Sequence, residues 1–340
     1  MLCSVVALRL RFRLLCSMSD LRNTILEALA KSRTRSSWND RLTHWERPPS
    51  VNEEAQIQRA ANAATALVST NALLTREGAS IRPQGSYFNN TNVRLEADMD
   101  LRVQLPDILV KYDDGIDTAQ ADAEHGYILT GRSFVDIGNS VKNELAEICR
   151  KQFGAQNVDV GKKAVTVAGL SGSRADVDLV PAFNLHWLFA DGNGGTYVTP
   201  GVVIVSEDGT KTYNFPQQHN ANGIEKRNNT AHRFKKIVRM AKRLNCEIAD
   251  DGAISRRLPS FLVECLIYSV ENSYFLHPND DRYDRLLRIL YRANDLLSDS
   301  EWHKTATEVN GIKFLFHSSQ NWTLSDARAF IIAAIARLEA

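Results

Sequence analysis

The sequence predicts an α+β fold of two lobes, and three patterns in the chain support that prediction. Residues 80–216 contain short segments of alternating polar and apolar side chains with turn residues between them, which is typical of strands and hairpins. From residue 228 onward the apolar residues recur at helical spacing instead. Between residues 50 and 68 a long amphipathic pattern predicts one helix ahead of the strands. We therefore expect a mixed sheet with helices in one lobe, a helical second lobe, and a ligand cleft between them.

The expected lobes divide the chain near residue 225. Residues 18–225 form the core lobe, including the long helix, and residues 226–340 form the C-terminal helical lobe. Residues 1–17 are interpreted as a poorly ordered upstream extension, because arginines interrupt their apolar run and a capped helix pattern follows Met18. A short helix lying on a membrane surface is the alternative for this extension.

The composition is that of an ordinary globular protein. The 340 residues are 44% hydrophobic and 24% charged, and a net charge of +1 argues against a strongly basic nucleic-acid binder. No apolar run reaches the ~20 residues that cross a bilayer, so no membrane association is expected. The five cysteines are scattered and lack metal-binding spacing, which favours a reduced, cytoplasmic location: Cys3, Cys16, Cys149, Cys246 and Cys265.

Spacing and caps predict the remaining elements. Ser50 and Glu53 form a candidate capping box for the long helix, whereas the polar stretch from Arg33 to Pro49 is predicted to be a surface loop. Residues 111–131 are acidic, and a solvated loop is favoured there over a metal site. Strands are expected at 80–84, 98–105, 163–168 and 175–181, hairpins between 191 and 216, and helices at 21–29, 134–148, 228–245, 259–270, 282–298 and 324–338.

Two predicted strands carry paired carboxylates. Asp98 and Asp100 begin the polar face of the strand over 98–105, about 6.5–7 Å apart, and Asp176 and Asp178 repeat the pattern in the strand over 175–181. If these strands pair, several carboxylates converge, and their repulsion and desolvation favour a bound pair of divalent cations. Two such ions would clamp the attacking and leaving oxygens of a phosphoryl transfer.

A glycine–serine turn lies twelve residues before the first acidic strand. Gly85 lets the backbone approach a triphosphate, and the Ser86 hydroxyl with the amides of a helix start would then hold phosphate oxygens. An ordinary turn is the alternative for this segment when it is taken alone.

With the paired carboxylates, these segments resemble the polymerase-β-type nucleotidyltransferases, and among them the cyclic GMP-AMP synthase/DncV-like enzymes, the bacterial CD-NTases. The resemblance runs from Pro48 to the C-terminus. It rests on Gln84-Gly85-Ser86-Tyr87, Thr91-Asn92-Val93-Arg94, Asp98-Met99-Asp100, Asp178-Leu179-Val180-Pro181 and Leu258-Pro259-Ser260-Phe261-Leu262-Val263-Glu264. It implies a polymerase-β-like nucleotidyltransferase core in the first lobe, with the long helix as a spine that bridges both lobes.

The resemblance also assigns roles to individual residues. Asp98, Asp100 and Asp178 would bind two Mg²⁺ ions, for which Mn²⁺ can substitute, and Asp178 would accept the proton of the attacking hydroxyl. Asp178 is preferred to Asp176 because the family places its third carboxylate directly before a Leu/Val-Val-Pro segment, and Asp176 is left as an auxiliary ligand or a plain strand residue. Gln84, Gly85 and Ser86 would bind the nucleotide.

Further nucleotide contacts are expected from the helical lobe. By resemblance Lys235 reaches the triphosphate, with Lys236 or Arg239 as alternatives, while Ser260 contacts phosphate and Phe261 stacks on a base. An N-cap serine beside a core phenylalanine is the alternative for the last two. Three polar side chains between the hairpins and the helical lobe are placed to read a base edge or simply to form the loop: Asn214, Gln217 and His219.

The implied function is a Mg²⁺-dependent synthase that joins nucleoside triphosphates into a cyclic di- or trinucleotide and releases pyrophosphate. Its product would activate a separate effector protein in antiphage signalling, and a regulatory protein partner is expected. The sequence lacks the zinc-bearing insertion of the metazoan enzyme, so no direct DNA sensing is expected. Two alternatives remain: a linear nucleotidyltransferase acting on RNA or another acceptor, and a non-catalytic scaffold that keeps the pocket.

Overall fold

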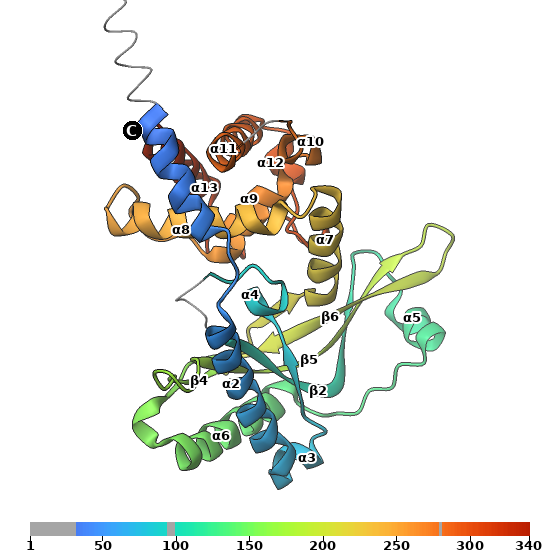
Figure 1. The fold of residues 1–340 in the computed structure, drawn as a ribbon. Coiled ribbons are helices and arrows are strands. Elements are labelled where there is room, and N and C mark those ends of the chain that lie inside the picture. The colour runs from blue at the N-terminus through green and yellow to red at the C-terminus, as the bar shows by residue number, and fades with distance from the viewer. Residues whose placement is uncertain (1–31, 94–98, 279–280) are drawn as a thin grey trace, which may run out of the picture.

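The computed structural model describes residues 32–93, 99–278 and 281–340 of the chain. These residues form a sheet-based core lobe and a helical lobe. In Figure 1 the core lobe is at the bottom and the helical lobe is at the top. The proposed extension over 1–17, the helix expected at 21–29 and the carboxylate of Asp98 lie outside the described residues. None of the described helices combines the length and apolar character that a membrane span requires.

The core lobe is built on one mixed, seven-stranded sheet in the order β1-β2-β5-β4-β3, with β6 added to β5 and β7 to β6. The β2–β5 pair is parallel and the other pairs are antiparallel. The strands are β1 (Ser80–Pro83), β2 (Met99–Tyr112), β3 (Val158–Val160), β4 (Val165–Val167), β5 (Val177–Ala190), β6 (Thr196–Val205) and β7 (Lys211–Asn214). Both expected acidic strands are therefore neighbours in the sheet.

Two long helices cover one face of this sheet, α2 (Val51–Thr70) and α6 (Phe134–Phe153). The capping box of α2 is confirmed: the Ser50 backbone N–H donates to Glu53 at 2.7 Å, and the Glu53 N–H donates to the Ser50 hydroxyl at 3.3 Å. Alternate residues of β2, from Met99 to Leu105, join these helices in the core cluster. Because side chains alternate along a strand, Asp100 of β2 and Asp178 of β5 lie on the opposite face.

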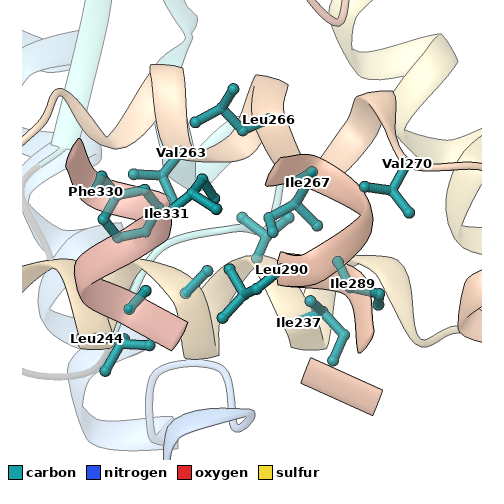
Figure 2. Close-up of a cluster of buried hydrophobic side chains, with 14 of the residues drawn as sticks. Ile237, Leu244, Val263, Leu266, Ile267, Val270, Ile289, Leu290, Phe330 and Ile331 are labelled. Atoms are coloured by element: carbon teal, nitrogen blue, oxygen red, sulfur yellow. The ribbon is translucent and has the colours of Figure 1, made fainter. Parts of the chain in front are cut away.

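The helical lobe has its own apolar core, formed mainly by α8 (Phe234–Asp250), α9 (Ser260–Ser269), α11 (Arg282–Ser298) and α13 (Leu324–Glu339). Figure 2 shows its buried side chains meeting between these helices. The smaller helical segments of the chain are α3 (Ala72–Arg76), α4 (Gly85–Phe88), α5 (Thr118–His125), α10 (Asn272–Phe275), α12 (Trp302–Thr305) and a 3₁₀ turn at Ala155–Asn157.

The loop predicted between Arg33 and Pro49 is wrong, because residues 32–45 form a helix. Trp38 and Leu42 are one turn apart and enter the core of the helical lobe, and Trp45 packs against it. The Arg41 guanidinium lies 4.3 Å from the Trp38 ring centroid. The expected spine is thus two helices in succession, which are separated by the proline pair that follows Arg47. Residues 32–45 pack on the helical lobe, and α2 packs on the core lobe.

The single helix predicted over 228–245 is also wrong. The structure has two helices there, α7 (Pro216–Asn229) and α8, separated by Ala231 and His232 with φ of 48° and 62°. Such left-handed backbone ends a helix. The acidic segment over 111–131 is not wholly a loop either, since β2 continues to Tyr112 and α5 follows.

Candidate active site

Asp100 and Asp178 occupy facing positions in the parallel β2–β5 pair. Neighbouring strands lie about 4.7–4.9 Å apart, and both side chains are on the face that α2 and α6 leave uncovered. The expected meeting of the two acidic strands therefore holds for Asp100 and Asp178.

Gly85 brings the turn after β1 into contact with this pair. Its φ is +68°, and a Cβ built on it would lie 1.8 Å from Asp100 Oδ2, so any side chain would collide with the carboxylate. The Gln84 N–H donates to the Asp100 carbonyl at 3.0 Å. A glycine is thus required here by backbone conformation and by the approach of Asp100.

Thr166 orients Asp178. The two residues face one another in the β4–β5 pair, and the Thr166 hydroxyl donates to Asp178 Oδ1 at 2.6 Å. Asp176 has a different role, because its Oδ1 accepts from the Gly169 N–H at 2.6 Å and it does not line the cavity described next. The geometry agrees with the choice of Asp178 over Asp176.

A cavity of about 730 Å³ lies over these carboxylates, between the sheet and the helical lobe. Seven of the nine predicted site residues line it: Gln84, Gly85, Ser86, Asp100, Asp178, Ser260 and Phe261. Asn214 and His219 line it too, whereas Gln217 does not. The helical lobe adds Lys242, Glu264, Glu308 and Asn310.

Lys235, another of the nine predicted site residues, is buried in α8 but is not among the residues that line the cavity. Burial lowers the pKa of its ammonium, and the charge of Glu264 partly opposes that shift. Lys242, two turns further along α8, lines the cavity instead. The sequence analysis missed it, because eight cations crowd residues 226–243 and local spacing does not single out Lys242.

Glu264 of α9 is the centre of a buried polar network at the edge of the cavity. Its carboxylate accepts from Lys242 at 3.0 Å, from the Thr91 hydroxyl at 2.7 Å and pairs with His219 Nε2 at 2.9 Å. Burial alone would raise the pKa of Glu264, but Lys242 and the bonds from His219 and Thr91 hold it well below the ordinary value. The network joins the core lobe, α7, α8 and α9.

Ser260 and Phe261 open α9 at the mouth of the cavity. The Phe261 ring lies 5.4 Å from the His219 ring and 6.0 Å from the Trp322 ring, measured between centroids, and remains partly exposed. Its partly exposed ring lines the cavity and offers a surface on which a planar ring can stack.

The carboxylates fit a divalent cation in chemistry, since Mg²⁺ prefers carboxylate, water and phosphate oxygens. Asp100 and Asp178 are the carboxylates of the sheet that line the cavity among the described residues, and Asp98 lies outside those residues. Within the described ranges, no group of three or more His, Cys, Asp or Glu side chains is placed to hold a metal ion.

We expect Thr166→Val to lower the turnover number by roughly tenfold with little change in the KM for nucleotide, because Asp178 loses the hydroxyl that orients it. Steady-state kinetics of the purified variant measure both quantities. Thr166→Ser keeps the hydroxyl and should restore most of the rate. An equal loss in both variants would contradict the positioning role.

Comparison with known proteins shows what the chain is similar to. A model of the cGAS/DncV-like nucleotidyltransferase C-terminal helical domain matches residues 221–339. A cyclic dipyrimidine nucleotide synthase from Cecembia lonarensis is 33% identical over 88% of this chain and 98% of its own length. A cyclic dipurine nucleotide synthase from Elizabethkingia meningoseptica is 32% identical over 85% of this chain and 94% of its own length. A solved CdnE cyclic dinucleotide synthase from Elizabethkingia meningoseptica, with GTP and Apcpp, has a TM-score of 0.68 and 28% identity, covering 88% of this chain and 98% of that one.

Proposed function

The chain belongs to the cGAS/DncV-like nucleotidyltransferases, the bacterial CD-NTases, and we propose that it joins two or three nucleoside triphosphates into a cyclic oligonucleotide in a Mg²⁺-dependent reaction. The predicted family and the α+β nucleotidyltransferase fold are confirmed. The relatives that share about a third of its residues are named as cyclic nucleotide synthases, so this chain is a nucleotidyltransferase of that kind. The observation that carries the proposal is the facing pair Asp100 and Asp178 beneath the Gly85 turn.

Each proposed transfer step forms one P–O bond and breaks another. The oxygen of a ribose hydroxyl attacks the α-phosphorus of a second nucleotide and forms a P–O bond. The bond between that phosphorus and the oxygen bridging to the β-phosphate breaks, and pyrophosphate leaves with the electron pair. The hydroxyl proton passes to Asp178 or to water. A final transfer within the linear product closes the ring.

Asp98, Asp100 and Asp178 are the proposed ligands of Mg²⁺, with Mn²⁺ as a substitute. When bound, the metal would supply countercharge for the phosphates and lower the pKa of the attacking hydroxyl. Orientation comes from the chain itself, because Thr166 holds Asp178 and the Gly85 turn packs against Asp100.

The donor triphosphate is proposed to lie along the rest of the cavity. Ser86 and Ser260 offer hydroxyls on its two sides, and Lys242 contributes positive charge, although it is shared with Glu264. Phe261 would stack on a base without selecting it. Lys235 stays a prediction, which its position outside the cavity lining does not favour.

Product analysis tests this function. Purified protein incubated with the four nucleoside triphosphates, Mg²⁺ and no primer is expected to release pyrophosphate and form a product that resists phosphatase, whose bases and ring size mass spectrometry identifies. EDTA should abolish the reaction and Mn²⁺ should restore part of it. Extension of added RNA without any phosphatase-resistant product would favour the linear transferase instead, and no turnover at all would favour a scaffold.

The expectations about partners stay predictions. Activation of a separate effector in antiphage defence, regulation by a protein partner, and the absence of direct DNA sensing are part of the proposal. Adding DNA to the reaction above checks the last of these, because an unchanged rate is expected.

A further inference from the structure

A second cavity, of about 450 Å³, lies on the same open face of the sheet as the catalytic carboxylates. Two arginines and three amide side chains line it: Arg82, Arg102, Gln104, Asn184 and Gln217. No aspartate or glutamate is among its lining residues in the described part of the chain. It is therefore a polar, cationic cavity with no acidic countercharge.

Arg102 is the unusual residue of this cavity. It is 4% exposed, yet its Nε and Nη1 are buried without a hydrogen-bond partner anywhere in residues 32–93, 99–278 and 281–340. Burial and the nearby charge of Arg82 lower the pKa of its guanidinium to about 10, so it stays charged at neutral pH. A buried charged donor without partners is costly, which indicates that an anion completes it in the working protein.

The register places this guanidinium beside the reacting centre. Arg102 follows Asp100 by two residues on the same face of β2, about 6.5–7 Å along the strand. Arg82 faces Arg102 across the β1–β2 pair and precedes Gln84 by two residues. On the other side, Gln104 Nε2 donates to Asn184 Oδ1 at 3.0 Å, while Gln104 Oε1 is buried with no partner among the described residues.

Two nucleotides must occupy the site in each transfer, and both carry phosphates. The donor triphosphate is assigned to the Gly85 turn and the helical lobe, whereas the acceptor must place only its ribose hydroxyl near Asp178. The acceptor's own 5′-triphosphate needs separate countercharge, because two triphosphates in one place repel each other strongly. The arginine cavity is the cationic site next to that position on the sheet.

Resting on the function proposed above, we propose that Arg102, assisted by Arg82, binds the 5′-phosphates of the acceptor nucleotide. The planar guanidinium offers paired donors that match phosphate oxygens, and its burial fixes their direction. The cavity would thereby orient the acceptor, so that its hydroxyl rather than its phosphates meets the donor.

Acceptors with and without phosphates test this assignment. A 2′,3′-dideoxynucleoside triphosphate can only donate, and an α,β-methylene nucleoside triphosphate can only accept, so one linear product forms. The rate of linear product formation is measured with this triphosphate acceptor and with the unphosphorylated nucleoside as acceptor. Both acceptors are tested with all four bases, in wild type and in Arg102→Met. We expect Arg102→Met to lower kcat/KM for the triphosphate acceptor by roughly ten- to hundredfold. The kcat/KM for the nucleoside acceptor and the KM for the donor should stay unchanged.

Matched variants complete the experiment. Arg150→Met makes the same change at an exposed position of α6, and we expect it to behave as wild type with both acceptors. The melting temperature of Arg102→Met should not fall, because the substitution removes a buried guanidinium without partners. Equal loss with both acceptors, or no loss with either, would overturn the assignment. If wild type forms no linear product with any acceptor, the proposed function itself fails, and the assignment fails with it.

Discussion

Replacing Asp178 by asparagine is expected to lower the rate of cyclic product formation by about a thousandfold or more. The substitution keeps the shape of the side chain and its bond from Thr166 but removes the charge that would bind metal and accept the hydroxyl proton. Asp100→Asn should cause a loss of the same order, because Asp100 faces Asp178 across the β2–β5 pair. Initial rates of pyrophosphate release under saturating nucleotide measure both losses.

Asp176→Asn is the matched control for this experiment. It makes the same chemical change two residues earlier in the chain, at a carboxylate that accepts a backbone bond from Gly169 and does not line the cavity. We expect it to retain activity within a few-fold of wild type. If Asp176→Asn were as inactive as Asp178→Asn, or if Asp178→Asn kept its activity, the assignment of the catalytic carboxylate would be wrong.

The acidic strands could be predicted from sequence because strict alternation fixes which side chains share a face. Asp100 and Asp178 therefore had to project from the same side of their strands. Their direct pairing required the additional assumption that the two strands are neighbours, since the 70-odd residues between them leave that choice open. The resemblance supplied the assumption, and the parallel register agrees with it.

Other elements were missed for identifiable physical reasons. In residues 32–45 the apolar positions Trp38, Leu42 and Trp45 have helical spacing, but arginine, serine and asparagine surround them and the composition resembled a loop. Helix α7 buries only His219 and Gly223, so it has almost no apolar stripe. Tertiary contacts support it instead, through side-chain amides that bond to backbone carbonyls on three other segments.

The site residues from the helical lobe were the hardest to identify from sequence. Eight cations lie in residues 226–243 without an acid among them, and nothing in that stretch distinguishes the residue that reaches the cavity. The distinction comes from Glu264, which lies 22 residues after Lys242 and pairs with it only in the folded protein. Long-range partners of this kind have no signature in local spacing.

Glu264→Gln is expected to lower the free energy of unfolding by about 3–5 kcal/mol, because it leaves the Lys242 ammonium buried without its counter-ion. With an unfolding entropy of about 2.1 cal/mol/K per residue, this corresponds to a fall of roughly 4–7 °C in melting temperature. Glu147→Gln, in a solvent-exposed pair with Lys151, is the matched control and should leave the melting temperature essentially unchanged. Thermal and urea denaturation measure both variants.

The same carboxylate gives this prediction a pH dependence with a definite sign. The pKa of Glu264 is lowered from its ordinary value of 4.5 in the folded protein, so its contribution to stability is present above pH 4.5 and is lost progressively as the pH falls below it. The difference in stability between wild type and Glu264→Gln should therefore be constant near neutral pH and shrink in acid. A difference that grew on acidification would mean that Glu264 is protonated in the folded protein, and its ion pair with Lys242 at the edge of the active site would then be absent.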